Sequence, residues 1–313
     1  MSLPRVLFMG SPEFAVPSLR ALVAAGYPVV AAVSQPDRPA GRGGKVALPP
    51  TKEAAIALAV PTFQPESLKD PAVQEALRAF QPELFVVAAY GKILPRAVLA
   101  IPERGSVNVH ASLLPRWRGA SPIAAAIRAG DPETGVSIME MAPKMDAGPV
   151  ISQARTPILP TDTTGTLEPR LAALGARTLV ETLPRWLAGE LPAVAQDEAA
   201  VTFCSLIAKS DGFLSRAMSA IEAERAVRAF SPWPGAGVEY RGERLAIWRA
   251  HLSPASASEA PGTLVIEGRL PAIHFPGALL VLDEVQKPGS RRLPGEAFLN
   301  GERGRLEAMV TLA

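Results

Sequence analysis

The chain has a single cysteine, Cys204, among its 313 residues, and only three histidines. One thiol excludes an internal disulfide, and it excludes the cysteine clusters that bind zinc. Proline, glycine or charge interrupts every apolar stretch before it reaches the roughly 18 residues of a membrane span. The N-terminal apolar run is also too short for a secretory leader. We therefore expect a cytoplasmic protein without a metal site or a membrane partner.

Three further features are missing. The formal charge is +2, from 32 basic and 30 acidic residues, so composition alone does not indicate nucleic-acid binding. The turn after the first apolar run reads GSPEF at 10–14 and lacks the glycine fingerprint of NAD and FAD sites. The chain has no G-x-S-x-G turn either, so no covalent serine intermediate is implied.

The first half of the chain alternates apolar runs with helical patterns, as β-α-β units do. Strands are predicted over residues 5–10, 28–34, 83–90, 105–110, 134–141 and 148–156. Helices are predicted over 14–26, 51–59, 70–80, 121–130 and 164–190. Asp70 before Pro71 is typical of a helix start. The pattern indicates an α/β, Rossmann-like domain with a mostly parallel sheet.

After residue 190 the pattern changes. Residues 191–208 have weak periodicity and are predicted to form a linker. One helix follows over 219–230, and then short apolar runs alternate with turns, which is typical of a small β-barrel or sandwich. The predicted domains are thus residues 1–190, a linker over 191–208, and a β-rich domain over 209–313.

The segment SVNVH, residues 106–110, places an amide and an imidazole two residues apart at a strand end. Residues i and i+2 of a strand point to one face, so Asn108 and His110 should enter one cleft. If the strand over 134–141 is also parallel, the loop after it delivers Asp146 to the same edge. The sequence therefore predicts that three polar side chains converge there.

An amide, an imidazole and a carboxylate suit acyl transfer to an amine. Asn108 and His110 can stabilise the oxyanion that forms when an amine attacks a carbonyl carbon. Asp146 would orient the imidazole, and an imidazole can also move the proton that the amine loses. A structural role for His110 and a plain turn role for Asp146 stay open on these grounds.

The stretch NVHASLLPRWRGASPI, together with MDAGPVI, resembles the N10-formyltetrahydrofolate-dependent formyltransferases. The resemblance implies that Asn108, His110 and Asp146 are catalytic and that formyltetrahydrofolate donates the formyl group, without a metal. It further implies an OB-like C-terminal barrel and a monomer. The folate-binding residues that it implies are Tyr90, Gly91, Lys92, Ile93, Leu94, Ser112, Leu113, Leu114 and Pro115.

Within that family, the chain is most similar to members that formylate the methionine of initiator tRNA. The loop SQPDRPAGRGGK resembles their tRNA-contacting insertion, and it is basic, with Arg38, Arg42 and Lys45 against Asp37. In their linker a Lys-x-x-Lys pattern is usual, whereas this chain reads LIAK, which leaves Lys209 for tRNA. Arg291 and Arg292 are further candidates for tRNA contact.

Three alternatives stay open. One is a formyltransferase for a sugar-nucleotide amine, although the basic loop argues against it. The second is a formyl-folate hydrolase. The third is a non-catalytic RNA-binding protein, against which the intact polar trio argues.

Overall fold

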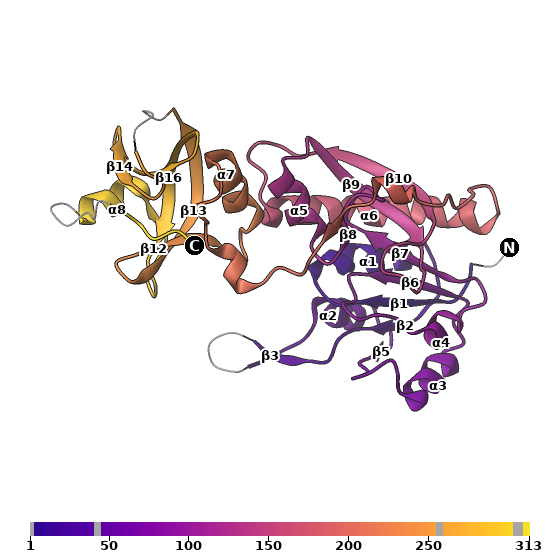
Figure 1. Cartoon of the computed structure of the whole chain (residues 1–313). Helices are drawn as coiled ribbons and strands as arrows, with labels where there is room; N and C mark the ends of the chain where they lie inside the picture. Colours follow the sequence, from indigo (N-terminus) through magenta and orange to yellow (C-terminus); the bar gives the residue numbers. More distant parts are fainter. Residues whose placement is uncertain (1–2, 41–44, 255–258, 303–308) are drawn as a thin grey trace. The chain divides into compact units, whose positions relative to one another are not determined.

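The computed structural model describes residues 3–40, 45–254, 259–302 and 309–313. The chain divides into two compact units. The first comprises Met1–Pro122, Glu133–Pro157 and Glu168–Ser205. The second comprises Ile123–Pro132, Ile158–Leu167 and Leu206–Ala313. Each unit has its own sheet (Figure 1), and the two are described in turn.

The first unit is built on a seven-stranded sheet with the order β10-β9-β7-β6-β1-β2-β5 (Figure 1). The strands are β1 (Val6–Gly10), β2 (Val29–Val33), β5 (Thr62–Phe63), β6 (Leu84–Ala88), β7 (Ser106–His110), β9 (Glu133–Glu140) and β10 (Val150–Pro157). The five strands from β5 to β7 are parallel. β1 and β6 are buried along their whole length, as expected for strands covered on both faces.

Helices cover both faces of this sheet. The helical elements of the first unit are η1 (Glu13–Ala15), α1 (Val16–Ala24), α2 (Pro50–Ala57), α3 (Pro71–Ala79), α4 (Arg96–Leu99), most of α6 (Thr164–Leu187) and η2 (Glu198–Ala200). Leu77 of α3 and Val98 of α4 pack in one cluster with Leu7 of β1. On the other face, Gly175 of α6 lies so close to Val109 that a Cβ there would meet its side chain. The sheet is therefore packed against helices on both faces.

The sheet is mostly parallel, as predicted, but the condition set on the strand over 134–141, that it also be parallel, is not met. β9 runs antiparallel to β7, with Glu140 opposite Val107 and Ser137 opposite His110. The carboxyl end of β9 consequently lies beside the amino end of β7. The loop over 141–149 must turn back over the sheet to bring Asp146 near His110.

The second unit contains a strongly bent antiparallel sheet with the strand order β12-β13-β16-β15-β14 (Figure 1). Its strands are β12 (Ala236–Tyr240), β13 (Glu243–Ser253), β14 (Leu264–Glu267), β15 (Leu270–Phe275), β16 (Ala278–Gln286) and β17 (Leu293–Pro294). The last residues of the chain link its two edges, since Thr311 pairs with Glu239 and Met309 pairs with Thr263. These bridges close the sheet into a barrel.

The core of this unit is formed by apolar side chains of the barrel strands and of the helices that pack against them. The helical elements of this unit are α5 (Pro122–Ala129), η3 (Lys209–Gly212), α7 (Ala220–Ala229) and α8 (Gly295–Gly301). Ser219 and Glu222 form a reciprocal capping box at the start of α7, which fixes where this helix begins. Phe230, Ile247 and Phe298 belong to the buried cluster. Across the described residues of both units, no helix combines the length and apolarity that crossing a membrane requires.

Candidate active site

Strand β7 presents Asn108 and His110 on one face of the sheet. Asn108 pairs with Val87 on one side and Met139 on the other, and residues opposite one another in a sheet share a face. The His110 side chain is buried, whereas Asn108 is half-buried. Within the described part of the chain, the Asn108 amide makes no hydrogen bond to another residue.

The His110 ring is held by a main-chain carbonyl. Its Nε2 lies 3.0 Å from the oxygen of Trp117, and because a carbonyl oxygen only accepts, the ring nitrogen must donate. Nδ1 lies 3.8 Å from Oδ1 of Asp146. That distance is longer than a hydrogen bond, so Nδ1 faces the carboxylate without being bonded to it.

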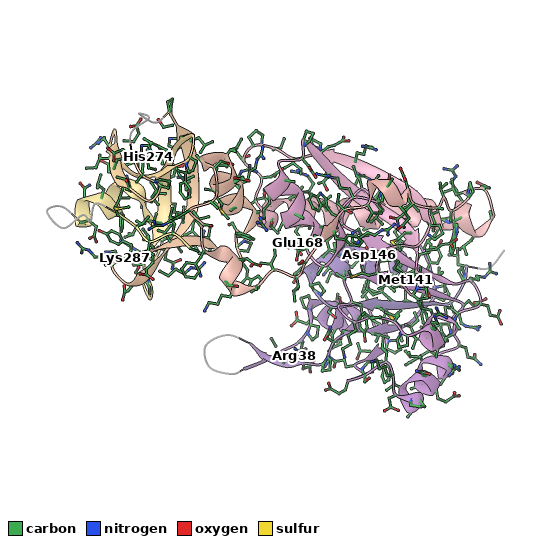
Figure 2. The ribbon with its side chains drawn as sticks, viewed as in Figure 1. Arg38, Met141, Asp146, Glu168, His274 and Lys287 are labelled. Atoms are coloured by element: carbon green, nitrogen blue, oxygen red, sulfur yellow. The ribbon has the colours of Figure 1, made fainter. Side chains whose placement is uncertain are left out.

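Asp146 lies in the loop between β9 and β10 (Figure 2). Its Oδ2 accepts a hydrogen bond of 2.8 Å from the main-chain N–H of Gly119. Its φ is +48°, a left-handed conformation that is uncommon outside glycine, although Asp and Asn adopt it more readily than other residues. The surrounding structure must therefore hold this loop in place.

A two-stranded ladder supports the partners of His110 and Asp146. β8 (Arg118–Gly119) pairs in parallel with β11 (Phe203–Cys204). Gly119 has a φ of +126°, and a Cβ there would collide with the Cys204 carbonyl oxygen. Burial raises the pKa of the Cys204 thiol, and the nearby Asp146 charge adds to the effect. The thiol therefore stays protonated at neutral pH and packs beside the site.

The turn over Ser112–Pro115, predicted to border the folate, is bonded to two strands. Ser137 of β9 accepts a hydrogen bond from the Leu114 N–H, 3.0 Å away, and donates to the Ser112 carbonyl at 2.7 Å. Gln153 of β10 donates to the Leu114 carbonyl at 2.8 Å and to the Ser137 hydroxyl at 2.9 Å. The turn is thus fixed relative to His110, which lies opposite Ser137.

The other predicted folate segment, residues 90–94, divides between core and surface. The side chains of Tyr90 and Leu94 are buried in the cluster of α3 and α4, and burial raises the pKa of Tyr90 to about 12. Ile93 is exposed, and Lys92 donates to the Pro65 and Glu66 carbonyls. Only the surface part of this segment can contact a ligand directly.

The predicted tRNA-contacting residues are spread over both units. Arg38 is exposed at the start of β3 (Arg38–Ala40), which pairs with β4 (Lys45–Ala47) (Figure 2). Arg42 lies outside the described residues, as does the side chain of Lys45. Lys209 and Arg291 are exposed. The Arg292 guanidinium stacks 3.7 Å from the ring centre of Trp248.

Sequence reasoning did not identify the side chains that hold these loops. Gln196 donates hydrogen bonds to the main chain of the Asp146 loop, and Arg118 is completely buried beside it. Neither residue belongs to a periodic pattern, so the sequence does not indicate their role. Their hydrogen bonds to residues far away in the chain indicate it in the structure. The described residues contain no group of three or more His, Cys, Asp or Glu side chains that could hold a metal ion. The arrangement instead offers an amide, an imidazole and a carboxylate to a polar substrate.

Known proteins resemble this chain along nearly its whole length. The chain is 49% identical over 297 residues to the methionyl-tRNA formyltransferase of Methylococcus capsulatus, covering 95% of this chain and 96% of the relative. It is 47% identical over 301 residues to the enzyme of the same name from Chloroflexus aggregans, covering 95% and 97%.

Solved structures share the fold at lower identity. The N-formyltransferase of Helicobacter canadensis, solved with folinic acid and dTDP-3-aminofucose, superposes with a TM-score of 0.67 at 18% identity, covering 91% of this chain and 100% of that one. The glycinamide ribonucleotide transformylase 1 of Symbiobacterium toebii has a TM-score of 0.53 at 21% identity, covering 61% and 94%.

Two family descriptions match nearly the whole chain. The family described as formyl transferase matches residues 4–183, and the formyl transferase C-terminal domain matches residues 206–303. The first match contains Asn108, His110 and Asp146, and the second contains the barrel strands. The chain therefore belongs to the formyltransferase family.

Proposed function

We propose that this protein transfers the formyl group of N10-formyltetrahydrofolate to the α-amino group of methionine on initiator tRNA. The observation that carries the proposal is the similarity to methionyl-tRNA formyltransferases along 95% of the chain. The convergence of Asn108, His110 and Asp146 on one sheet face supports it. The product is formylmethionyl-tRNA, which serves the start of translation.

The amine needs little help to become a nucleophile. A free α-amino group has a pKa of about 7.7–8.0, and esterification of the neighbouring carboxyl group lowers it. Much of the amine is therefore neutral at physiological pH. No strong general base is required, so the main demand on the site is to stabilise the charge that develops on the formyl oxygen.

The attack forms a bond from the amine nitrogen to the formyl carbon and places a negative charge on the former carbonyl oxygen. Asn108 donates to this oxyanion through its amide N–H, and His110 stabilises it from the same face. When the carbon–N10 bond breaks, the amine loses a proton and N10 gains one. His110 can carry that proton, with Asp146 stabilising the imidazolium.

The folate is proposed to lie between the turn over Ser112–Pro115 and the surface part of residues 90–94. The turn is immobilised by Ser137 and Gln153, which would preserve the distance between the bound formyl group and His110. Main-chain groups near Gly91 would form hydrogen bonds with the polar edge of the pterin. Leu113 would supply apolar contact.

The tRNA is proposed to contact the basic residues Arg38, Arg42, Lys45, Lys209, Arg291 and Arg292. Contacts of arginine and lysine with phosphates give affinity and position rather than base specificity. Leu206, which replaces the first lysine of the family's linker pattern, is exposed and would contribute no such contact. We propose further that the protein works as a monomer in the cytoplasm.

The direct test is formylation of purified initiator and elongator Met-tRNA with N10-formyltetrahydrofolate as donor. Rapid turnover that favours the initiator tRNA is the expected result. Turnover on an amino-sugar nucleotide without turnover on either tRNA would contradict the proposal. Release of formate from the donor with no transfer to an amine would instead identify a hydrolase.

A further inference from the structure

The segment over residues 194–204 forms part of the first unit, although its sequence is typical of a linker. Val194 and Val150 exchange two main-chain hydrogen bonds of 2.8 Å. Further along, the Thr202 carbonyl accepts from the Arg118 N–H at 2.9 Å, and the Thr202 hydroxyl accepts from the Trp117 N–H at 2.9 Å. The segment is thus attached on both sides of the site.

Gln196 lies between these two attachments and contacts the Asp146 loop directly. Its Nε2 donates to the carbonyl oxygen of Asp146 at 2.8 Å and to that of Gly148 at 2.7 Å. Its Oε1 accepts from Nε of Arg118 at 3.0 Å. One side-chain amide therefore joins the loop that carries Asp146 to Arg118 of β8, the residue before Gly119.

Arg118 makes this amide rigid. The arginine side chain has no exposed surface, and its Nη2 lies 2.7 Å from Oε1 of Glu198. A buried guanidinium held by a carboxylate and an amide has little freedom to turn, because each lost bond leaves a buried donor unsatisfied. The orientation of Gln196 is fixed in consequence, with its NH2 group toward the loop.

The Asp146 loop needs such support. Asp146 has a left-handed backbone, and residues 143–145 just before it are exposed. Among the described residues, its carboxylate accepts one hydrogen bond, from the Gly119 N–H. If the main chain of Asp146 shifted, the carboxylate would move relative to both Gly119 and His110.

We propose that Gln196 is a positioning residue for formyl transfer. Its amide holds the main chain of Asp146 and Gly148, so that the Asp146 carboxylate faces Nδ1 of His110. Gln196 itself does not touch the reacting atoms and acts through Asp146. The inference rests on the proposed function, because formyl transfer is the reaction in which its effect is measured.

Two substitutions separate the bonds that Gln196 makes. Q196L removes all of them at similar volume. Q196E keeps an acceptor for Arg118 but cannot donate to the two loop carbonyls, and it places negative charge against them. The matched controls are Q74L and Q74E, because Gln74 also donates its amide to a main-chain carbonyl, that of Leu68 at 3.0 Å, away from the site.

The expected result is a fall in kcat of about 10–100-fold in both Gln196 variants, as for residues that orient a catalytic group. The KM values for folate and for tRNA should stay within about twofold, since Gln196 contacts neither substrate. The Gln74 variants should keep the wild-type kcat. Thermal unfolding of every variant is recorded alongside, and Q196E gives the result if Q196L does not fold.

A double-mutant cycle with D146N distinguishes positioning from general stability. If Gln196 acts through Asp146, Q196E should cost less than about threefold in the D146N background. The proposal would be overturned if the separate losses of kcat in Q196E and D146N multiplied in the double variant. It would also be overturned if the kcat of Q196E were within about twofold of wild type.

If the wild-type protein transfers no formyl group to Met-tRNA, the proposed function fails. The same cycle is then measured on formate release from formyltetrahydrofolate or on the amine that it does accept.

Discussion

Replacing Asp146 by Asn tests the electrostatic part of the mechanism. Nδ1 of His110 lies 3.8 Å from the Asp146 carboxylate, so at an effective dielectric constant of about 20 the attraction on an imidazolium there is about 4 kcal/mol. That energy corresponds to a factor of roughly 10³ in rate. Since the Asp146 side chain is 18% exposed and water screens part of its charge, we expect D146N to lower kcat by about 10²–10³-fold.

The fold should tolerate this change, because the amide oxygen of Asn can still accept from the Gly119 N–H. The assay is single-turnover formylation of initiator Met-tRNA at saturating formyltetrahydrofolate, with thermal unfolding measured in parallel. D70N is the matched control, since Asp70 accepts from the Ala72 N–H at 2.9 Å at the start of α3 and Asn caps helices equally well. A D146N rate within about tenfold of wild type, at unchanged stability, would refute the electrostatic argument.

Three further predictions use the same preparation. N108A should lower kcat by about 10²–10³-fold through loss of an oxyanion donor, while folate binding, measured by fluorescence titration, stays unchanged. R42A should raise the KM for tRNA most at low salt, reduce the dependence of that KM on salt because one phosphate contact is lost, and leave folate affinity unaltered; equal loss toward a small amine would contradict this. Burial raises the pKa of the Glu302 carboxyl, but hydrogen bonds from Lys287 and Tyr240 outweigh burial and lower this pKa overall. The ionised carboxylate therefore stabilises the fold at pH values above the pKa that Glu302 has in the unfolded chain. This stability is lost as the pH falls from the unfolded pKa through the lower folded pKa. E302Q should therefore unfold at lower urea at neutral pH and lose less stability on acidification than wild type; parallel acid profiles would exclude this role.

Much of the fold of the first unit could be predicted from its sequence. Continuous apolar runs predicted the buried strands β1 and β6, because parallel strands are covered on both faces. Asp70 before Pro71 predicted the start of α3, where Asp70 accepts from the Ala72 N–H. The i, i+2 spacing of Asn108 and His110 placed both on one face, as the register with β9 requires.

Strand direction and the bracing of the loops could not be predicted. A buried strand such as β9 has the same apolar pattern whether it runs parallel or antiparallel, so its sequence gives no direction. β8 and β11 have two residues each, which is too short for any periodicity. Gln196 acts on Asp146 from 50 positions away, and its neighbours are irregular and polar.

The hydrogen bond from His110 to Trp117 determines which ring nitrogen can take part in proton transfer. Because Nε2 donates to a main-chain carbonyl, a neutral imidazole carries its proton there and leaves a lone pair on Nδ1. Nδ1 lies 3.8 Å from Oδ1 of Asp146, which is too far for a hydrogen bond between them even when Nδ1 is protonated. A proton taken up at Nδ1 therefore lies beside a negative charge while remaining free to bond the substrate. In the proposed mechanism the same ring would accept the proton that the amine loses, donate to the oxyanion and pass the proton to N10. That mechanism requires Asp146 to keep its distance from His110, and this is the role that we propose for Gln196, which the buried Arg118 holds behind the Asp146 loop.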